Sequence, residues 1–208
     1  MQCNTNHNPL KRSKIMTQML DMEARSRLIR KAMEDDLFRQ KLVASPRTAV
    51  KDELGITVPS DQSLHVIEAA AQRLDFHIPL KPEAFDSADT ASDILDQLTR
   101  NMTKLSPELT RRLEAHAKIL TKVWTDPEFL NGFMEDPKSI IEDLAEESLP
   151  ENCEVVVHRD DEKNMFLLLP NLGTDAELTD DELELVSGGL ADWIALLLFM
   201  AALGAFSW

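Results

Sequence analysis

Tyrosine is absent from this chain of 208 residues, and cysteine is nearly so, with only Cys3 and Cys153. Two cysteines so far apart do not make the disulfide framework of a small secreted domain, and they favour folding in a reducing compartment. The chain also lacks an apolar run of the signal-peptide kind near its start, because Lys, Arg and Glu interrupt Ile15–Ile29. We therefore expect a protein that folds in the cytoplasm.

Positive charge is also scarce, since 22 Lys and Arg face 37 Asp and Glu and the formal net charge is −15. Such a chain does not neutralise phosphates in bulk, which argues against a nucleic-acid partner. Basic residues gather in 1–31, where a helical pattern over Leu10–Val43 places them on one face. That face is either a membrane or partner surface or, as we expect, the solvated face of a packed helix. We expect the many carboxylates to be solvated as well.

The chain offers no catalytic or metal-binding constellation. Its five histidines are scattered, without a ligand spacing such as H-E-x-x-H. His65 and His77 fall in strand-like segments, where we expect a structural role. We therefore expect no enzymatic activity, no cofactor and no metal.

An internal repeat organises the middle of the chain. Residues 36–68 align without a gap with residues 127–159, 91 positions later, and Pro46 meets Pro137 in this alignment. One offset that holds over such a span indicates a tandem duplication.

Each copy predicts two helices and then two strands. A residue with an N-capping side chain, Ser45 or Asp136, stands before a proline suited to the first helical turn. The predicted helices are Phe38–Ala44, Arg47–Leu54, Glu128–Glu135 and Lys138–Glu147. Alternating apolar residues predict the strands, at Leu64, Val66, Phe76 and Ile78 and at Val155, Val157 and Met165–Leu169.

The two strands of each copy are expected to form a hairpin, with Arg159–Asn164 as the connection in the second copy. The first hairpin is less clear, because Glu68–Arg73 is alanine-rich and prone to form a helix. Between the copies, Pro82–Val123 has the spacing of two helices broken at Ser106-Pro107, with Ser106 as the cap of the second.

These patterns predict an α+β fold: two copies of a small helix-helix-β-hairpin unit, joined by helices and followed by a hydrophobic C-terminal helix. The expected divisions are a basic N-terminal helical extension (1–34), a degenerate first repeat (35–81), a helical linker (82–124), a second repeat (125–177), a short helix with a glycine pair (178–189) and a hydrophobic tail (190–208).

Residues 178–189 read LTDDELELVSGG and predict a short amphipathic helix, apolar on one face and acidic on the other. Thr179 and Glu182 form a capping box. Gly188 and Gly189 have no Cβ, so the backbone there is narrow enough to enter a tunnel that leads to a nucleophile. The alternative is an ordinary helix with a glycine C-cap.

This stretch resembles the double-glycine leader of bacterial peptide precursors, through Leu178, Thr179, Glu182, Leu183, Val186, Gly188 and Gly189. In that family a peptidase domain fused to an ABC exporter recognises the helix and cuts after the second glycine. The resemblance therefore implies cleavage between Gly189 and Leu190 and release of the tail.

The tail, residues 190–208, is apolar except for Asp192, Gly204 and Ser207. As a helix it would span roughly 28 Å, close to the ~30 Å hydrocarbon core of a bilayer. Once released, it would suit a membrane-active, bacteriocin-like peptide. The alternatives are an uncleaved anchor for a tail-anchored interaction module, or a tail folded back onto a groove of the leader until export. Thioether rings within the tail are excluded, because it has neither Cys nor Thr.

A second resemblance covers residues 126–170, with DPEF, DPKSIIEDL and LPENCEVVVHRDDEKNMFLLLP. This run is similar to a leader-peptide family related to the nitrile hydratase α subunit, whose members are precursors of ribosomal peptide natural products. It implies partner enzymes that modify the tail. The first copy departs from the pattern, since Ser45 replaces the Asp before its proline.

Nitrile hydratase itself binds iron or cobalt through a C-x-x-C-S-C cluster, which is missing here, so a metal-binding protein of that kind is the least favoured alternative. The two resemblances together predict a cytoplasmic precursor whose core peptide is secreted.

Overall fold

The computed structural model describes residues 20, 22–70, 72–81 and 107–169. Within these ranges the chain is a mixture of helices and strands, which confirms the α+β class. The glycine pair, the helix expected before it and the hydrophobic tail lie outside the described residues.

The helices of the described residues come in two sets of three, one for each copy of the repeat. They are α2 (Met22–Glu34), α3 (Asp36–Ala44) and α4 (Pro46–Leu54), and then α6 (Pro107–Thr125), α7 (Pro127–Glu135) and α8 (Pro137–Ala145). The predicted helix pair of each copy is confirmed, as is a helix that begins at Pro107.

Side-chain caps decide where several of these helices begin. Asp35 accepts a hydrogen bond from the backbone N–H of Phe38 at 3.0 Å, and it divides the helical pattern of Leu10–Val43 into α2 and α3. Asp136 accepts from the N–H of Ser139 at 3.2 Å, as its predicted N-cap role requires. Ser45 occupies the predicted N-cap position, but its side chain makes no capping hydrogen bond.

The first helix of each set belongs to the repeat. At the same offset of 91 residues, α2 aligns with the C-terminal part of α6, and Glu34 meets Thr125. Leu28 and Ile119 are equivalent in this alignment, and they are 0% and 1% exposed. Within the ranges that the structure describes, each unit therefore has three helices and two strands.

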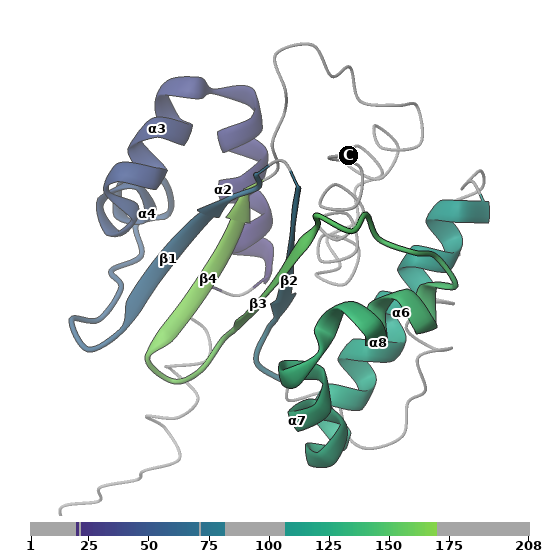
Figure 1. Ribbon diagram of the computed structural model, residues 1–208. Helices are drawn as coiled ribbons and strands as arrows, with labels where there is room; N and C mark the ends of the chain where they lie inside the picture. Colours follow the sequence, from purple (N-terminus) through teal and green to yellow (C-terminus); the bar gives the residue numbers. More distant parts are fainter. Residues whose placement is uncertain (1–19, 21, 71, 82–106, 170–208) are drawn as a thin grey trace, which may run out of the picture.

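The strands pair between the units. They are β1 (Ser63–Glu68), β2 (Arg73–Ile78), β3 (Glu154–Arg159) and β4 (Asn164–Leu169). β1 lies parallel to β4 and β2 lies parallel to β3, so each two-stranded sheet takes one strand from each copy (Figure 1). The segments were predicted correctly as strands, but the antiparallel hairpins were wrong.

The residues between the strands explain why no hairpin forms. A tight hairpin favours a turn such as Asn-Gly, with positive φ at its central residues. The segment between β3 and β4 has no glycine, and the Asp161 side chain instead accepts hydrogen bonds from the N–H groups of Lys163 and Asn164, both at 2.7 Å. The second strand of each copy, β2 or β4, therefore pairs with a strand of the other copy.

This exchange builds two hydrophobic cores. Leu167 and Leu169 of β4 are 2% and 0% exposed, and they pack with the helices of the first unit. Phe76 and Ile78 of β2 pack among the helices of the second unit, where Phe133 is fully buried. Each core is therefore completed by a strand of the other copy.

The two units differ in the residue that ends the helix before the strands. Gly55 ends α4 with φ of 70°, and the equivalent residue after α8 is Glu146, with φ of 52°. A residue with a Cβ is disfavoured in this left-handed region, whereas glycine is not. We expect Glu146→Gly to raise the free energy of unfolding by about 0.5–1 kcal/mol. Urea unfolding measures the gain, and the Glu135→Gly variant, at the exposed last residue of α7, is expected to lose stability instead.

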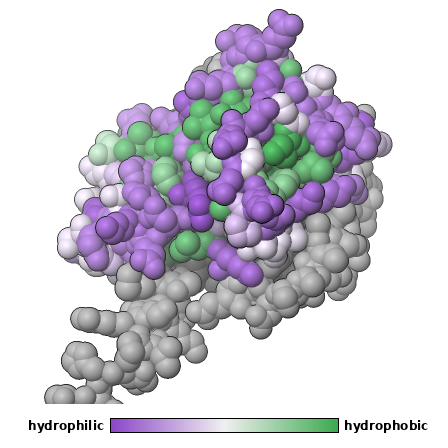
Figure 2. Space-filling model, turned by 60° about the horizontal axis from the view of Figure 1, so that its bottom comes forward, coloured by the Kyte–Doolittle hydropathy of each residue, from purple (hydrophilic) through white to green (hydrophobic). Residues whose placement is uncertain are grey.

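Figure 2 shows hydrophilic residues over most of the described part of one face, with hydrophobic residues gathered in patches between them. In the part of the chain that the structure describes, the large apolar side chains that remain exposed are Leu37, Val43, Leu80 and Met134. None of the described helices is long and apolar enough to cross a membrane.

Candidate functional site

The predicted cleavage site at Gly188, Gly189 and Leu190 lies outside the described residues, and so does the predicted exporter-recognition helix with Leu178, Thr179, Glu182, Leu183 and Val186. The structure therefore tests none of these assignments. What it does show is a buried polar cluster between the two units and an apolar pocket in the second unit.

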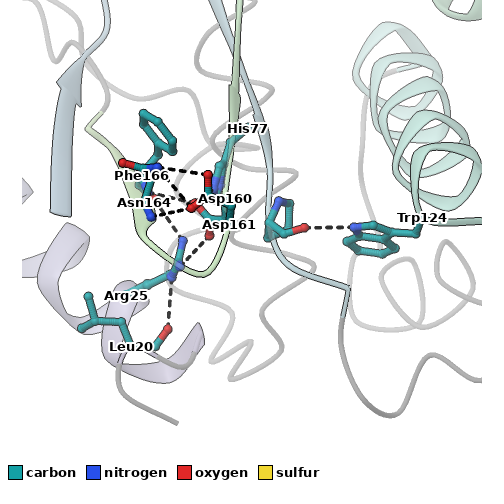
Figure 3. Close-up of polar contacts among 9 residues, drawn as sticks. Leu20, Arg25, His77, Trp124, Asp160, Asp161, Asn164 and Phe166 are labelled. Carbon is teal, nitrogen blue, oxygen red and sulfur yellow. Dashed lines mark hydrogen bonds and ion pairs between the residues drawn. The ribbon is translucent and has the colours of Figure 1, made fainter. Parts of the chain in front are cut away.

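The polar cluster centres on Asp160, the residue directly after β3 (Figure 3). Its Oδ2 lies 2.7 Å from Nη2 of Arg25, which comes from α2 of the other unit, and its Oδ1 lies 3.0 Å from Nε2 of His77 on β2. Oδ1 also accepts the backbone N–H of Phe166 at 2.9 Å. The Asp160 side chain is fully buried, and that of Arg25 is 8% exposed.

Arg25 uses its remaining donors on the backbone. Its Nη1 donates to the carbonyl of Phe166 at 3.0 Å, and its Nε donates to the carbonyl of Leu20 at 3.1 Å. One side chain of the first unit thus fixes both Asp160 and the start of β4 from the second unit. We infer that Arg25 and Asp160 act as a clamp between the units.

A second pair of side chains links β2 and β3. Asp75 is 5% exposed, and its Oδ1 lies 2.7 Å from Nε2 of His158 on the neighbouring strand. Arg73 donates from Nε to the same carboxylate. The buried positions of Asp75 and Asp160 contradict the expectation that the carboxylates are solvated.

The basic face of α2 was also expected to be solvated, and Arg25 contradicts this as well, because it is 7% exposed. Arg27 does lie on the surface, where it contacts Glu53. The structural role expected for His77 agrees with its hydrogen bond to Asp160, and His65 on β1 bonds to Asn164.

Burial and hydrogen bonding set the protonation of this cluster. Burial lowers the pKa of His77, although the hydrogen bond to Asp160 opposes the shift. Burial alone would raise the pKa of Asp160, but the hydrogen bond from His77 and the charge of Arg25 lower it below its ordinary value. The resulting state is an ionised Asp160 that accepts from a neutral His77, with the proton on Nε2 of the imidazole.

The pocket has room for about 60 Å³ and lies between α6, α8 and β2. Most of its wall is apolar, including Ile119, Ile141 and Phe76. The ring of His116 lies 4.4 Å from that of Phe76, centroid to centroid. An ion pair of Arg112 and Glu147 adds charge to the wall. The space is several times that needed by one water molecule and less than the ~150 Å³ of a cavity that binds benzene, so it suits one aliphatic side chain.

His116 is the unusual polar group of this pocket. It is 5% exposed, and its Nε2 is buried without a hydrogen-bond partner among the residues that the structure describes. Burial and then the nearby His77 lower the pKa of His116 from 6.5 to about 3. Its imidazole is therefore neutral at physiological pH and has a ring nitrogen available for a ligand.

The buried histidines predict acid sensitivity. His116 has an ordinary pKa of 6.5 and a folded pKa of about 3, so protonation favours the unfolded chain between these values. The contribution of the neutral His116 to the free energy of unfolding is therefore complete above pH 6.5. It is lost as the pH falls toward 3, at about 1.4 kcal/mol per pH unit. Urea unfolding at pH 7, 5.5 and 4.5 measures this slope.

The variant His116→Leu is expected to make the dependence of the free energy of unfolding on pH shallower, by the amount that one bound proton contributes. Lys118→Leu, at an exposed position of the same helix, serves as the control and should leave it unchanged. An unaltered slope in His116→Leu would contradict the neutral state assigned to this imidazole.

No group of three or more His, Cys, Asp and Glu in the described parts of the chain is placed to hold a metal ion. Cys153 is a buried free thiol, and burial raises its pKa. The hydrogen bonds of His77 and His158 go to carboxylates that join strands and units. This arrangement serves to hold the two copies together.

Comparison with known proteins gives one informative likeness. The chain is 30% identical over 88 residues to Polytheonamide B of Bacterium symbiont subsp. Theonella swinhoei (strain pTSMAC1), and the match covers 38% of this chain and 61% of that protein. The chain thus spans less than two thirds of the curated relative. No family model matches the chain, and no solved structure matches it. The likeness supports the class of ribosomal peptide natural product precursors.

Proposed function

We propose that the chain is the precursor of a ribosomal peptide natural product, with a folded leader ahead of a glycine pair and a hydrophobic core peptide at 190–208. The observation that carries the proposal is the similarity to Polytheonamide B. The double-glycine pattern of 178–189 and the apolar tail after it support the same class. The leader itself has no enzymatic activity in this proposal.

The two-unit fold suits a leader that is held rigid while enzymes work on its tail. Two cores and the Arg25–Asp160 clamp join the copies, so the leader presents one constant surface. In this proposal, post-translational modification enzymes bind that surface. The sequence of the second unit, which resembles the nitrile hydratase-like leader family, supports this role. A peptidase-containing ABC exporter then recognises Leu178–Val186 and cuts after Gly189.

The released peptide, Leu190–Trp208, is in this proposal a secreted, membrane-active compound of the bacteriocin kind. Its apolar length matches a bilayer, and Trp193 and Trp208 stand near its ends, where aromatic side chains favour the membrane interface. The precursor stays in the cytoplasm until this cleavage.

Substitution at the glycine pair tests the proposal. We expect mass spectrometry of the medium of producing cells to find a peptide that begins at Leu190, and Gly189→Val to reduce it at least tenfold, because a branched side chain blocks a narrow protease tunnel. The control Gly204→Val adds the same side chain beyond the cleavage site and should still give a secreted peptide of increased mass.

A full-length chain that stays in the membrane fraction, with no peptide in the medium of any variant, would overturn the precursor assignment. It would favour the uncleaved tail-anchored module instead. A mass offset of the released peptide from the plain sequence would identify the modification.

A further inference from the structure

The pocket of the second unit exists because smaller side chains stand where the first unit has larger ones. Ala145 in the pocket wall is equivalent to Leu54, and Asp75 is equivalent to Phe166, each at the offset of 91 residues. Leu54 and Phe166 both pack against the core of the first unit. The duplicated fold thus fills this position in one copy and leaves about 60 Å³ in the other.

The polar residue at this position has changed as well. His116 is equivalent to Arg25, whose guanidinium makes hydrogen bonds with Leu20, Phe166 and Asp160. His116 instead leaves Nε2 buried without a partner among the described residues. An unsatisfied buried nitrogen costs about 1–3 kcal/mol, which a ligand with a polar backbone group would recover.

The described structure ends at Leu169, which is hydrogen-bonded to the segment that leads to β2 in the wall of this pocket. The carbonyl of Leu169, the last residue of β4, accepts from the N–H of Ala69 at 2.9 Å. Leu74 lies in the pocket wall only five residues after Ala69, a path of at most about 18 Å. The 20 residues from Pro170 to Gly189 are long enough to bring the tail to any point of the leader.

We propose that this pocket holds an aliphatic side chain of the chain's own hydrophobic tail, residues 190–208, and that His116 makes a hydrogen bond to the docked backbone. The inference rests on the proposed function, in which the tail remains attached until export. An apolar stretch of this length is a liability in water, and a site on the leader would cover part of it. The pocket and its one free ring nitrogen provide such a site.

The tail has suitable side chains at Leu190, Ile194, Leu196, Leu197, Leu198 and Leu203. A neutral imidazole either donates to a carbonyl or accepts from an N–H, according to its tautomer. The docking therefore does not depend on a charged residue of the tail. It also accounts for the differences at Ala145 and His116 between the two units.

Hydrogen exchange of the full chain, followed by mass spectrometry, tests the docking. We expect amides within 190–208 to exchange at least tenfold more slowly than in a free tail peptide in the same detergent-free buffer. Ser148 lies exposed in the wall of the pocket, and Ser148→Phe would place a ring in the opening and remove this protection. The matched control is Thr57→Phe, at the equivalent exposed position of the first unit, which should leave the protection unchanged.

A second variant, Ala145→Leu, fills the pocket with the residue that the first unit has there and should have the effect of Ser148→Phe. Exchange in 22–54 shows for each variant that the first unit remains folded. An unprotected tail in the parent chain, or equal loss in Ser148→Phe and Thr57→Phe, would overturn the proposal. Protection that disappears on dilution would also overturn it, because the occupant would then be the tail of a second copy.

This experiment separates the docking from the proposed function. If the peptide that begins at Leu190 is secreted but is unprotected in the precursor, the docking fails and the function stands. If the tail is protected but never released, the proposed function fails while the pocket still has its occupant.

Discussion

Replacing Asp160 with alanine is expected to lower the free energy of unfolding by about 3–5 kcal/mol, because the Arg25 guanidinium would remain buried without its carboxylate. The backbone N–H of Phe166 and Nε2 of His77 would lose an acceptor at the same time. Stability of small domains is only about 5–15 kcal/mol, so this one substitution removes a large part of it. Urea unfolding at pH 7, followed by circular dichroism, measures the loss.

Two further variants distinguish the clamp from a general loss of packing. Asp143→Ala, at an exposed position of α8, is expected to change stability by no more than about 0.5 kcal/mol. The double variant Arg25→Met, Asp160→Leu leaves no buried charge unpaired and should recover the part of the loss that comes from the charge, although the N–H of Phe166 and Nε2 of His77 still lack their acceptor. A loss below 1 kcal/mol in Asp160→Ala would show that the clamp contributes little.

Local sequence signals predicted most of the secondary structure of the described residues. The Asp-Pro at 136–137 marks the start of α8 because a capping carboxylate and a proline both suit a first helical turn. Alternating apolar residues located β3 and β4 within a residue or two. The connection Glu68–Arg73, which composition made helix-prone, became a turn because it joins two strands that lie in different sheets.

The partners of the strands could not be predicted from the same signals. An alternating pattern shows that a strand has a buried face, but it does not say which strand lies beside it. A short connection favoured a hairpin, yet β4 pairs with β1, 101 residues earlier in the register. The choice depends on how two whole units pack, which no local pattern records.

The buried ionic residues were missed for a related reason. Arg25 stands in a row of basic residues that looks like one solvated face, and only the tertiary fold shows that this one side chain points into the protein. A signal was present in the sequence, because α2 and α6 align at the offset of the repeat and Arg25 is then equivalent to His116. Extending the alignment toward the N-terminus would have identified both positions as special.

The strand exchange leads to the second large prediction, that neither unit folds alone as a monomer. The second unit takes Leu74, Phe76 and Ile78 of β2 into its core, all at 5% exposure or less. Burial of such side chains contributes about 1.5–3 kcal/mol each, so their loss removes an amount comparable with the whole stability of a small domain. We expect residues 82–177, expressed alone, to be unfolded at low concentration.

At higher concentration the same fragment is expected to dimerise, because β4 is equivalent to β2 at the repeat offset and would take its place in a second copy. Sedimentation and circular dichroism over a hundredfold range of concentration would show helix and dimer appearing together. Residues 1–81 added as a separate chain should replace the dimer with a one-to-one complex, since they restore β2 to the second core and return β4 to β1. A monomeric fragment that unfolds cooperatively at all concentrations would mean that each unit can close its own sheet, and the paired cores would then not be what joins the two units.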